Sequence, residues 1–116
     1  MARNFMLGAL SVDERYATPS SWHFEVLVKH PQYPNVAAKV GTVDVHYPCA
    51  GDIRFHATVC LDPKYIAVEK QQLPAKEVVV ETVLRAFEVS KDELWSVLYL
   101  HYARGEQTMD NRAYYS

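Results

Sequence analysis

Three stretches of this chain alternate apolar and polar residues with a period of two, a pattern typical of β-strands with one buried face. They run from Trp22 to Lys29, from Val43 to Tyr47 and from Ile53 to Cys60. Because successive side chains on a strand point to opposite faces, each stretch predicts one core-facing set and one outward-facing set. We therefore expect a sheet that contains these three strands.

The outward-facing positions of the predicted strands carry the ionisable groups that are candidates for a site. If the strands share one sheet, these groups share one surface, and they include His23, Asp44, His46 and His56. Imidazole and carboxylate bind zinc and other divalent metals, so these four residues are candidate metal ligands. No close pair such as HxH or HxxxH occurs in the chain, however. We favour a solvated sheet face whose charges pair across the strands, and we expect no catalytic residue, no resident metal and no cofactor.

The turn over residues 48–51 predicts that the second and third strands form a hairpin. Directly opposed residues lie on the same face, so only a loop with an odd number of residues keeps both apolar sets together. Loops of about three and about five residues both satisfy this condition. The opposed pairs are Asp44–Arg54 and His46–Asp52 for the shorter loop, and Asp44–His56 and His46–Arg54 for the longer one.

Turn residues predict the rest of the front half. Residues 5–10 fit either an edge strand, which we favour, or an irregular arm. The Asp62–Pro63 turn predicts that residues 65–69 return as another antiparallel strand. Residues 34–41 fit either a short helical turn or an extended lead-in, and the sequence leaves both alternatives open. The front half is thus predicted to be an antiparallel meander.

Further along the chain the apolar period changes from two to 3.6. The residues at helical spacing are Val79, Val80, Val83, Leu84 and Phe87. They predict a core-facing helix over residues 76–88. Ser90 and Glu93 have the spacing of a capping box, which predicts a second helix over residues 91–104.

The predicted fold class is therefore α+β: an antiparallel β-meander of about four strands followed by two consecutive α-helices packed on its apolar face. A length of 116 residues suits one domain, so we expect a single α+β domain over residues 1–116. Its C-terminal tail, residues 106–116, is either loose or docked on the domain. The 49% hydrophobic and 22% charged residues are close to average globular usage, which argues against disorder.

Charge and cysteine content narrow the function classes. The 12 Lys and Arg residues do not outnumber the 14 Asp and Glu residues, so no excess of cations is available to neutralise phosphates. Two cysteines are too few for a disulfide framework, and no stretch has the length of a signal peptide or a membrane span. We expect a cytoplasmic protein that does not bind membranes.

The run Leu84–Leu94, LRAFEVSKDEL, resembles the helix-turn-helix pattern of bacterial regulators. It has an apolar helix, a short turn with a serine, and a second helix, so the resemblance implies DNA binding through residues 91–104. A recognition helix presents Arg, Lys, Asn, Gln or Ser to the groove. Here Asp92 and Glu93 stand at the end that usually enters the groove, and they would repel phosphates. Nucleic-acid binding stays an alternative that we do not favour.

Aromatic residues are frequent late in the chain, where tyrosine and tryptophan favour an interface. The candidate interaction residues are Trp95, Tyr99, Tyr102, Tyr114 and Tyr115. The predicted second helix is also apolar over more than half of its circumference, so a second surface should cover it. We predict a small non-catalytic binding protein that contacts another macromolecule, a protein, and forms a homodimer through this helix and the tail. The alternatives are the helix-turn-helix regulator and a metal- or small-ligand-binding protein or enzyme that uses the histidine-rich sheet face.

Overall fold

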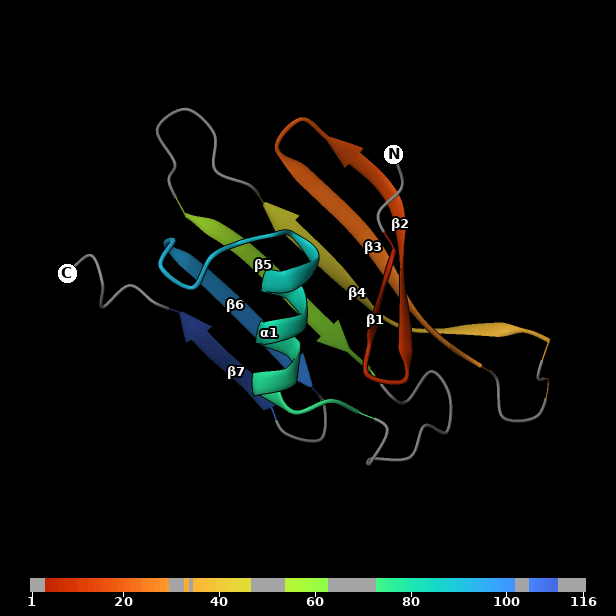
Figure 1. Ribbon diagram of the computed structural model, residues 1–116. Coiled ribbons are helices and arrows are strands. Elements are labelled where there is room, and N and C mark those ends of the chain that lie inside the picture. The colour runs from red at the N-terminus through yellow and green to blue at the C-terminus, as the bar shows by residue number, and fades with distance from the viewer. Residues whose placement is uncertain are drawn as a thin grey trace.

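In the part of the chain that the structure describes, seven strands form one mixed sheet and one helix lies on one of its faces (Figure 1). The computed structural model describes residues 4–29, 33, 35–46, 54–62, 73–101 and 105–110. The elements are β1 (Phe5–Leu7), β2 (Leu10–Thr18), β3 (Ser21–Lys29), β4 (Ala37–His46), β5 (Phe55–Leu61), α1 (Lys76–Ala86), β6 (Trp95–His101) and β7 (Gly105–Asp110).

The strands lie in the sheet in the order in which they follow one another along the chain. All neighbouring pairs are antiparallel except β5 and β6, which run parallel. Consecutive parallel strands need a connection that returns the chain to the end of the sheet where the first strand began, and α1 lies in this connection. Five antiparallel strands are thus followed by a β5–α1–β6 crossover and by the β6–β7 hairpin.

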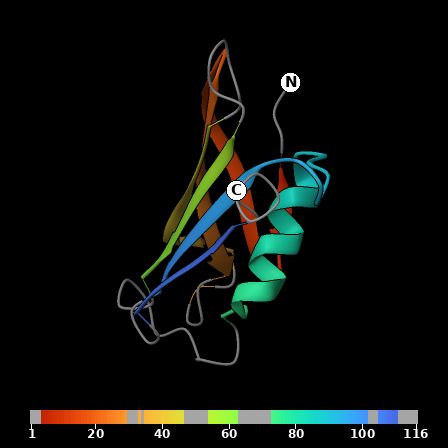
Figure 2. The same ribbon diagram turned by 90° about the vertical axis from the view of Figure 1, so that its left-hand side faces the viewer.

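The core lies between α1 and one face of the sheet, as the edge-on view in Figure 2 shows. The helix buries Val79, Val80, Val83 and Leu84, which recur at the spacing of one helix face. Phe87, directly after α1, lies among four aromatic rings of the sheet. Its ring centroid is 6.2 Å from Phe5, 6.0 Å from Trp22, 5.7 Å from Phe24 and 5.8 Å from Phe55. This cluster joins the end of the helix to β1, β3 and β5.

A bulge in β2 changes which side chains face outward. The register of the β2–β3 pair shifts between Glu14 and Tyr16, so Arg15 has no directly opposed residue. One extra residue moves the following side chains to the opposite face. As a result Tyr16 lies opposite His23 and shares its face.

A second bulge lies in the β3–β4 pair. Val26 pairs with Gly41 and Leu27 pairs with Lys39, so Val40 is the extra residue of β4. Val40 and Gly41 are both buried, although they are neighbours in sequence. The bulge therefore interrupts the strict alternation of β4.

The predicted fold class, an α+β domain with about four strands and two helices, is wrong. The helix predicted over 76–88 is present as α1, but the helix predicted over 91–104 is not. Residues 95–101 form β6, which lies between β5 and β7. The structure is instead a mostly β fold with a mixed sheet.

The physical reason for this error lies in a pattern that satisfies two periods. Trp95, Val97, Tyr99 and His101 are buried and alternate with less buried residues, which is strand spacing. One of the two capping-box contacts forms, because the Ser90 main-chain N–H donates to Glu93 Oε1 at 2.8 Å. The Ser90 hydroxyl, however, accepts from the main-chain N–H of Asp92 at 3.2 Å. They close a turn that leads into a strand rather than into a helix. The proposed helical dimer surface and the helix-turn-helix geometry disappear with the second helix.

The other expectations have mixed outcomes. The three alternating stretches are confirmed as β3, β4 and β5, and the edge strand predicted over 5–10 is present as β1, with β2 starting at Leu10. The alternatives for residues 34–41 are decided in favour of an extended chain from Ala37 onward. Gly105 and residues 106–110 of the predicted tail form β7. The strand predicted over 65–69 lies outside the described residues.

Candidate functional site

The sheet face that points away from α1, here called the outer face, carries the histidine-bearing strands. Directly opposed residues of neighbouring strands share a face, so the register assigns its members. The described residues of the outer face that matter below are Asp13, Tyr16, Ser21, His23, Glu25, Thr42, Asp44, His46, His56, Thr58, Cys60, Ser96, Leu98 and Leu100. The edge-on view shows no described element covering this face (Figure 2). The four predicted metal-ligand candidates therefore lie on one open surface.

Three of these side chains form an ordered group, here called the histidine–aspartate cluster: Tyr16, His23 and Asp44. His23 Nδ1 donates a hydrogen bond to Asp44 Oδ1 at 2.6 Å. The Tyr16 ring stacks on the imidazole at a centroid distance of 4.2 Å and an interplanar angle of 19°. Side-chain exposures of 24% for His23 and 41% for Asp44 leave the pair partly open to solvent. The carboxylate and the phenol ring together fix the orientation of the imidazole.

The hydrogen-bond chain continues from the other nitrogen of the imidazole. Ser21 Oγ lies 3.4 Å from His23 Nε2, and the hydroxyls of Ser21 and Thr18 are 2.6 Å apart. The order serine, histidine, aspartate is that of the relay in serine hydrolases. Ser21 is only 8% exposed, however, so its hydroxyl does not face a space that could hold an acyl group. The chain of contacts orders the imidazole and does not present a nucleophile.

The remaining two histidines face each other across the β4–β5 pair. His46 lies directly opposite His56, and Asp44 lies opposite Thr58. Both predicted hairpin registers are therefore wrong, because the connection is longer than either predicted loop. Residues 47–55, nine in all, separate the opposed histidines. This number is odd, so the predicted shared face of Asp44, His46 and His56 is nevertheless present.

The described residues contain no group of three or more His, Cys, Asp or Glu side chains that could hold a metal ion. His23 already uses Nδ1 in its contact with Asp44. The outer face thus brings His23, Asp44, His46 and His56 onto one surface without gathering them around one point.

Charges are concentrated on the β2–β4 half of the outer face. The Glu25 carboxylate forms ion pairs with the Arg15 guanidinium at 3.5 Å and with the Lys39 ammonium at 3.9 Å. These exposed pairs contribute little to stability. They give this half a mixture of both signs, whereas the β5–β6 half presents uncharged side chains such as Thr58 and Leu98 together with His56.

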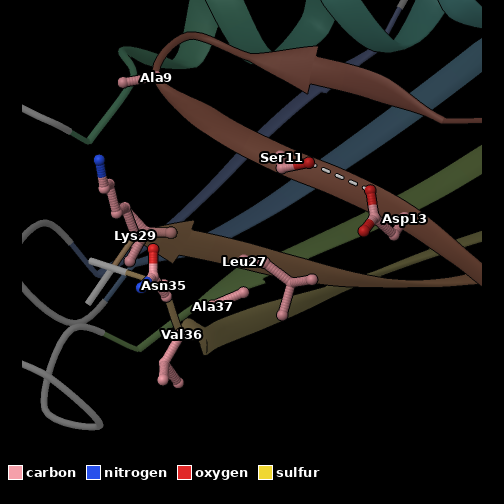
Figure 3. A pocket seen from close by; sticks show the side chains of 9 residues that line it. Ala9, Ser11, Asp13, Leu27, Lys29, Asn35, Val36 and Ala37 are labelled. Carbon is pink, nitrogen blue, oxygen red and sulfur yellow. Dashed lines mark hydrogen bonds between the residues drawn. The ribbon is translucent and has the colours of Figure 1, made fainter. Parts of the chain in front are cut away.

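A hollow of about 300 Å³ opens at one end of the sheet, where β2, β3 and the start of β4 meet (Figure 3). It is lined by Ala9, Ser11, Asp13, Leu27, Val28, Lys29, Asn35, Val36 and Ala37. Ser11 Oγ donates to Asp13 Oδ1 at 3.1 Å, and the Lys29 side chain extends away from this carboxylate. Sequence reasoning missed this hollow, because it depends on how the bulged strands and residues 35–37 come together.

Cys60 carries a free thiol on the outer face, at the end of β5. Partial burial raises the pKa of this thiol, and the carboxylates of Asp62 and Asp44 raise the same pKa further. A higher pKa lowers the thiolate fraction at neutral pH, so the environment disfavours a nucleophilic role. Cys49 lies outside the described residues.

Two of the predicted interaction residues are buried. Trp95 is 6% exposed and Tyr99 is 0% exposed, and the Tyr99 hydroxyl donates to the Pro74 carbonyl at 3.0 Å. Packing within the core explains the presence of these two aromatic residues, so neither of them requires a second protein as an explanation. Tyr102, Tyr114 and Tyr115 lie outside the described residues.

The fold and the site define a mostly β protein whose mixed sheet has one face packed under a helix and one open polar face. Comparison with known proteins gives no match to a protein-family model, to a curated protein or to a solved structure. Among the described residues, no helix combines the length and the apolar character that crossing a membrane requires.

Proposed function

We propose that this protein is a non-catalytic binding protein that contacts a protein partner through the outer face of its sheet. The observation that carries the proposal is the histidine–aspartate cluster, which is ordered before any partner binds. Side chains that are already fixed lose less conformational entropy on binding than mobile ones. Tyr16, the member of this cluster that is 60% exposed, belongs to a residue type enriched at interfaces.

The chemistry of the outer face favours a protein over a nucleic acid. Glu25 lies between the cations Arg15 and Lys39, and Asp44 adds a second carboxylate, so the described residues of the outer face form no continuous basic stripe for a phosphate backbone. A surface of mixed sign can be complementary to itself when two copies meet about a two-fold axis. A second copy of this chain is therefore the partner that we expect first. The proposed compartment is the cytoplasm, which suits the free thiol of Cys60.

Site-specific photocrosslinking in the cells that make the protein tests this proposal. A photoreactive amino acid is placed at position 16 or 58 on the outer face, and at position 78 as the matched control. Thr58 is exposed, and Val78 is 45% exposed on α1, on the other side of the sheet. We expect positions 16 and 58 to crosslink to the same protein and position 78 not to do so.

Native mass spectrometry over a range of concentrations then distinguishes the possible partners. A dimer that Tyr16→Ala weakens would support a second copy of this chain as the partner. A crosslinked protein of different mass would show that the partner is another protein. Equal crosslinking from all three positions would contradict binding through the outer face. A metal or small-molecule adduct that disappears in His46→Ala would contradict a function limited to protein contacts.

A further inference from the structure

A groove lies on the other side of the sheet, between α1 and the edge strand β7. Its volume is about 200 Å³, and its lining residues are Glu77, Val80, Glu81, Leu84, Lys91, Trp95 and Met109. Met109 pairs with Val97 across β6 and β7, so both side chains point toward the helix side. Val97 is 1% exposed whereas Met109 is 36% exposed, so the cover that α1 provides ends between these two strands.

The groove lies beside a free sheet edge. β7 is the last strand in the sheet order, so within the described chain its outer edge has no strand partner. An edge strand presents main-chain N–H and C=O groups to any extended segment of suitable chemistry. A strand added there would direct every second side chain toward the helix side, which is where the groove opens.

We propose that an extended segment of a partner protein pairs with β7 and inserts one large apolar side chain into the groove. An apolar cavity of about 150 Å³ can hold a benzene ring, so the groove has room for an aromatic or branched aliphatic side chain. A second hollow, of about 250 Å³, shares Glu81, Leu84 and Lys91 with the groove and extends it along the chain after α1. An elongated depression of this kind suits an extended segment rather than a single small molecule.

Charge at the rim specifies the partner further. Glu77 and Glu81 are exposed on α1, and Lys91 lies 3.5 Å from Glu81, so the groove itself has an excess of one negative charge among the three charged residues that line it. Arg85 lines only the second hollow, so the excess is confined to the groove beside β7. A basic residue of the partner, two positions from the apolar one, would lie on the same face of the added strand and near these carboxylates. The expected motif is therefore an apolar residue, any residue, and then Lys or Arg, or the reverse order.

This surface is separate from the outer face, so the two proposals can fail independently. Random peptides displayed on phage are selected on the immobilised protein, and the enriched peptides are then synthesised and titrated. The groove variant is Met109→Lys, and its matched control is Val78→Lys, which makes the same change at an exposed helix position outside the groove. Thermal unfolding followed by circular dichroism shows whether each variant is folded.

We expect enrichment of the apolar and basic motif. Met109→Lys should lower peptide affinity at least about tenfold, which corresponds to about 1.4 kcal/mol, while Val78→Lys should leave it unchanged. N-methylation of alternate main-chain amides of the peptide should abolish binding, because a strand addition needs these donors. If Met109→Lys does not fold, Glu77→Gln/Glu81→Gln tests the same groove, since it should weaken only peptides that contain the basic residue.

Three results would overturn the proposal. One is a phage selection in which none of the enriched peptides loses affinity for the Met109→Lys or the Glu77→Gln/Glu81→Gln variant. Another is binding that N-methylation does not affect, since this would exclude main-chain pairing. The third is a dimer in native mass spectrometry that Met109→Lys dissociates, because the occupant of the β7 edge would then be a second copy of this chain.

Discussion

Gly41 allows close approach of β4 and β5, and replacing it should destabilise the protein strongly. A Cβ atom at this position would lie 2.0 Å from the Cys60 carbonyl oxygen and 2.9 Å from Leu61 Cδ2. Carbon and oxygen atoms in neighbouring strands normally approach to no less than about 3.3 Å. The obstacle is main chain, which cannot rotate away as the end of a side chain can, so the two strands must separate by about 1.3 Å.

The expected magnitude follows from two contributions. Overpacking in a buried site destabilises by about 1–3 kcal/mol, and weakening of about two ladder hydrogen bonds beside Gly41 adds about 1 kcal/mol for each bond. Gly41→Ala should therefore lower the free energy of unfolding by roughly 3–5 kcal/mol, a large share of the about 5–15 kcal/mol typical of a domain.

The matched control is Gly8→Ala, at the turn between β1 and β2. A Cβ there meets nothing within 4 Å, but φ is +63°, in the left-handed region that disfavours alanine. We expect a loss of about 1 kcal/mol from this conformational effect alone. Urea unfolding, followed by tryptophan fluorescence and circular dichroism, measures both values. If Gly41→Ala loses less stability than Gly8→Ala, the close contact between β4 and the Cys60 carbonyl is refuted.

Three further predictions concern single side chains. Asp44→Asn should lower the free energy of unfolding by about 1 kcal/mol, because the contact with His23 is weakened. A double-mutant cycle tests this reason, since the loss should vanish in a His23→Ala background. Tyr99→Phe should lower it by about 1–3 kcal/mol, because a buried main-chain carbonyl loses its donor, and urea unfolding would contradict this with an unchanged midpoint. In a Cys49→Ser background, Cys60 should react with iodoacetamide more slowly than free cysteine at neutral pH, because its raised pKa lowers the thiolate fraction. Its rate should still rise with pH above about 8.5, and a plateau at or below this pH would contradict the raised pKa.

The parts of the fold that could be predicted from sequence are those in which one face is buried and the other is not. In β3, β4 and β5, period-two alternation reports this asymmetry directly, and it also predicts that His23, Asp44, His46 and His56 share a face. The loop between β4 and β5 could not be predicted in length, but parity alone determined the face. The shared surface was therefore predictable while the individual opposed pairs were not.

The stacking of Tyr16 on His23 had no sequence signal. Strict alternation from Asp13 would direct Arg15 outward and Tyr16 toward the core. The bulge after Glu14 reverses this assignment, and a bulge depends on how the strand fits its neighbours. The central contact of the candidate site thus arises from a local irregularity that periodicity cannot detect.

The wrong prediction of a helix where β6 lies has a different cause. The position of β6 in the sheet also accounts for the groove. β6 reads as a nearly continuous apolar run, because Leu98 and Leu100 on its outer face are apolar in addition to the buried side chains on its inner face, so helix and strand periods both fit it. The crossover that makes β6 parallel to β5 also carries α1 onto the sheet, where it packs against β1 and β6. β7 is added by a hairpin beyond this helix and receives less cover, which explains why Met109 is more exposed than Val97. The apolar groove is therefore a consequence of the strand order. Because Met109 is only partly covered, Met109→Lys should affect the binding of a partner more than the stability of the fold.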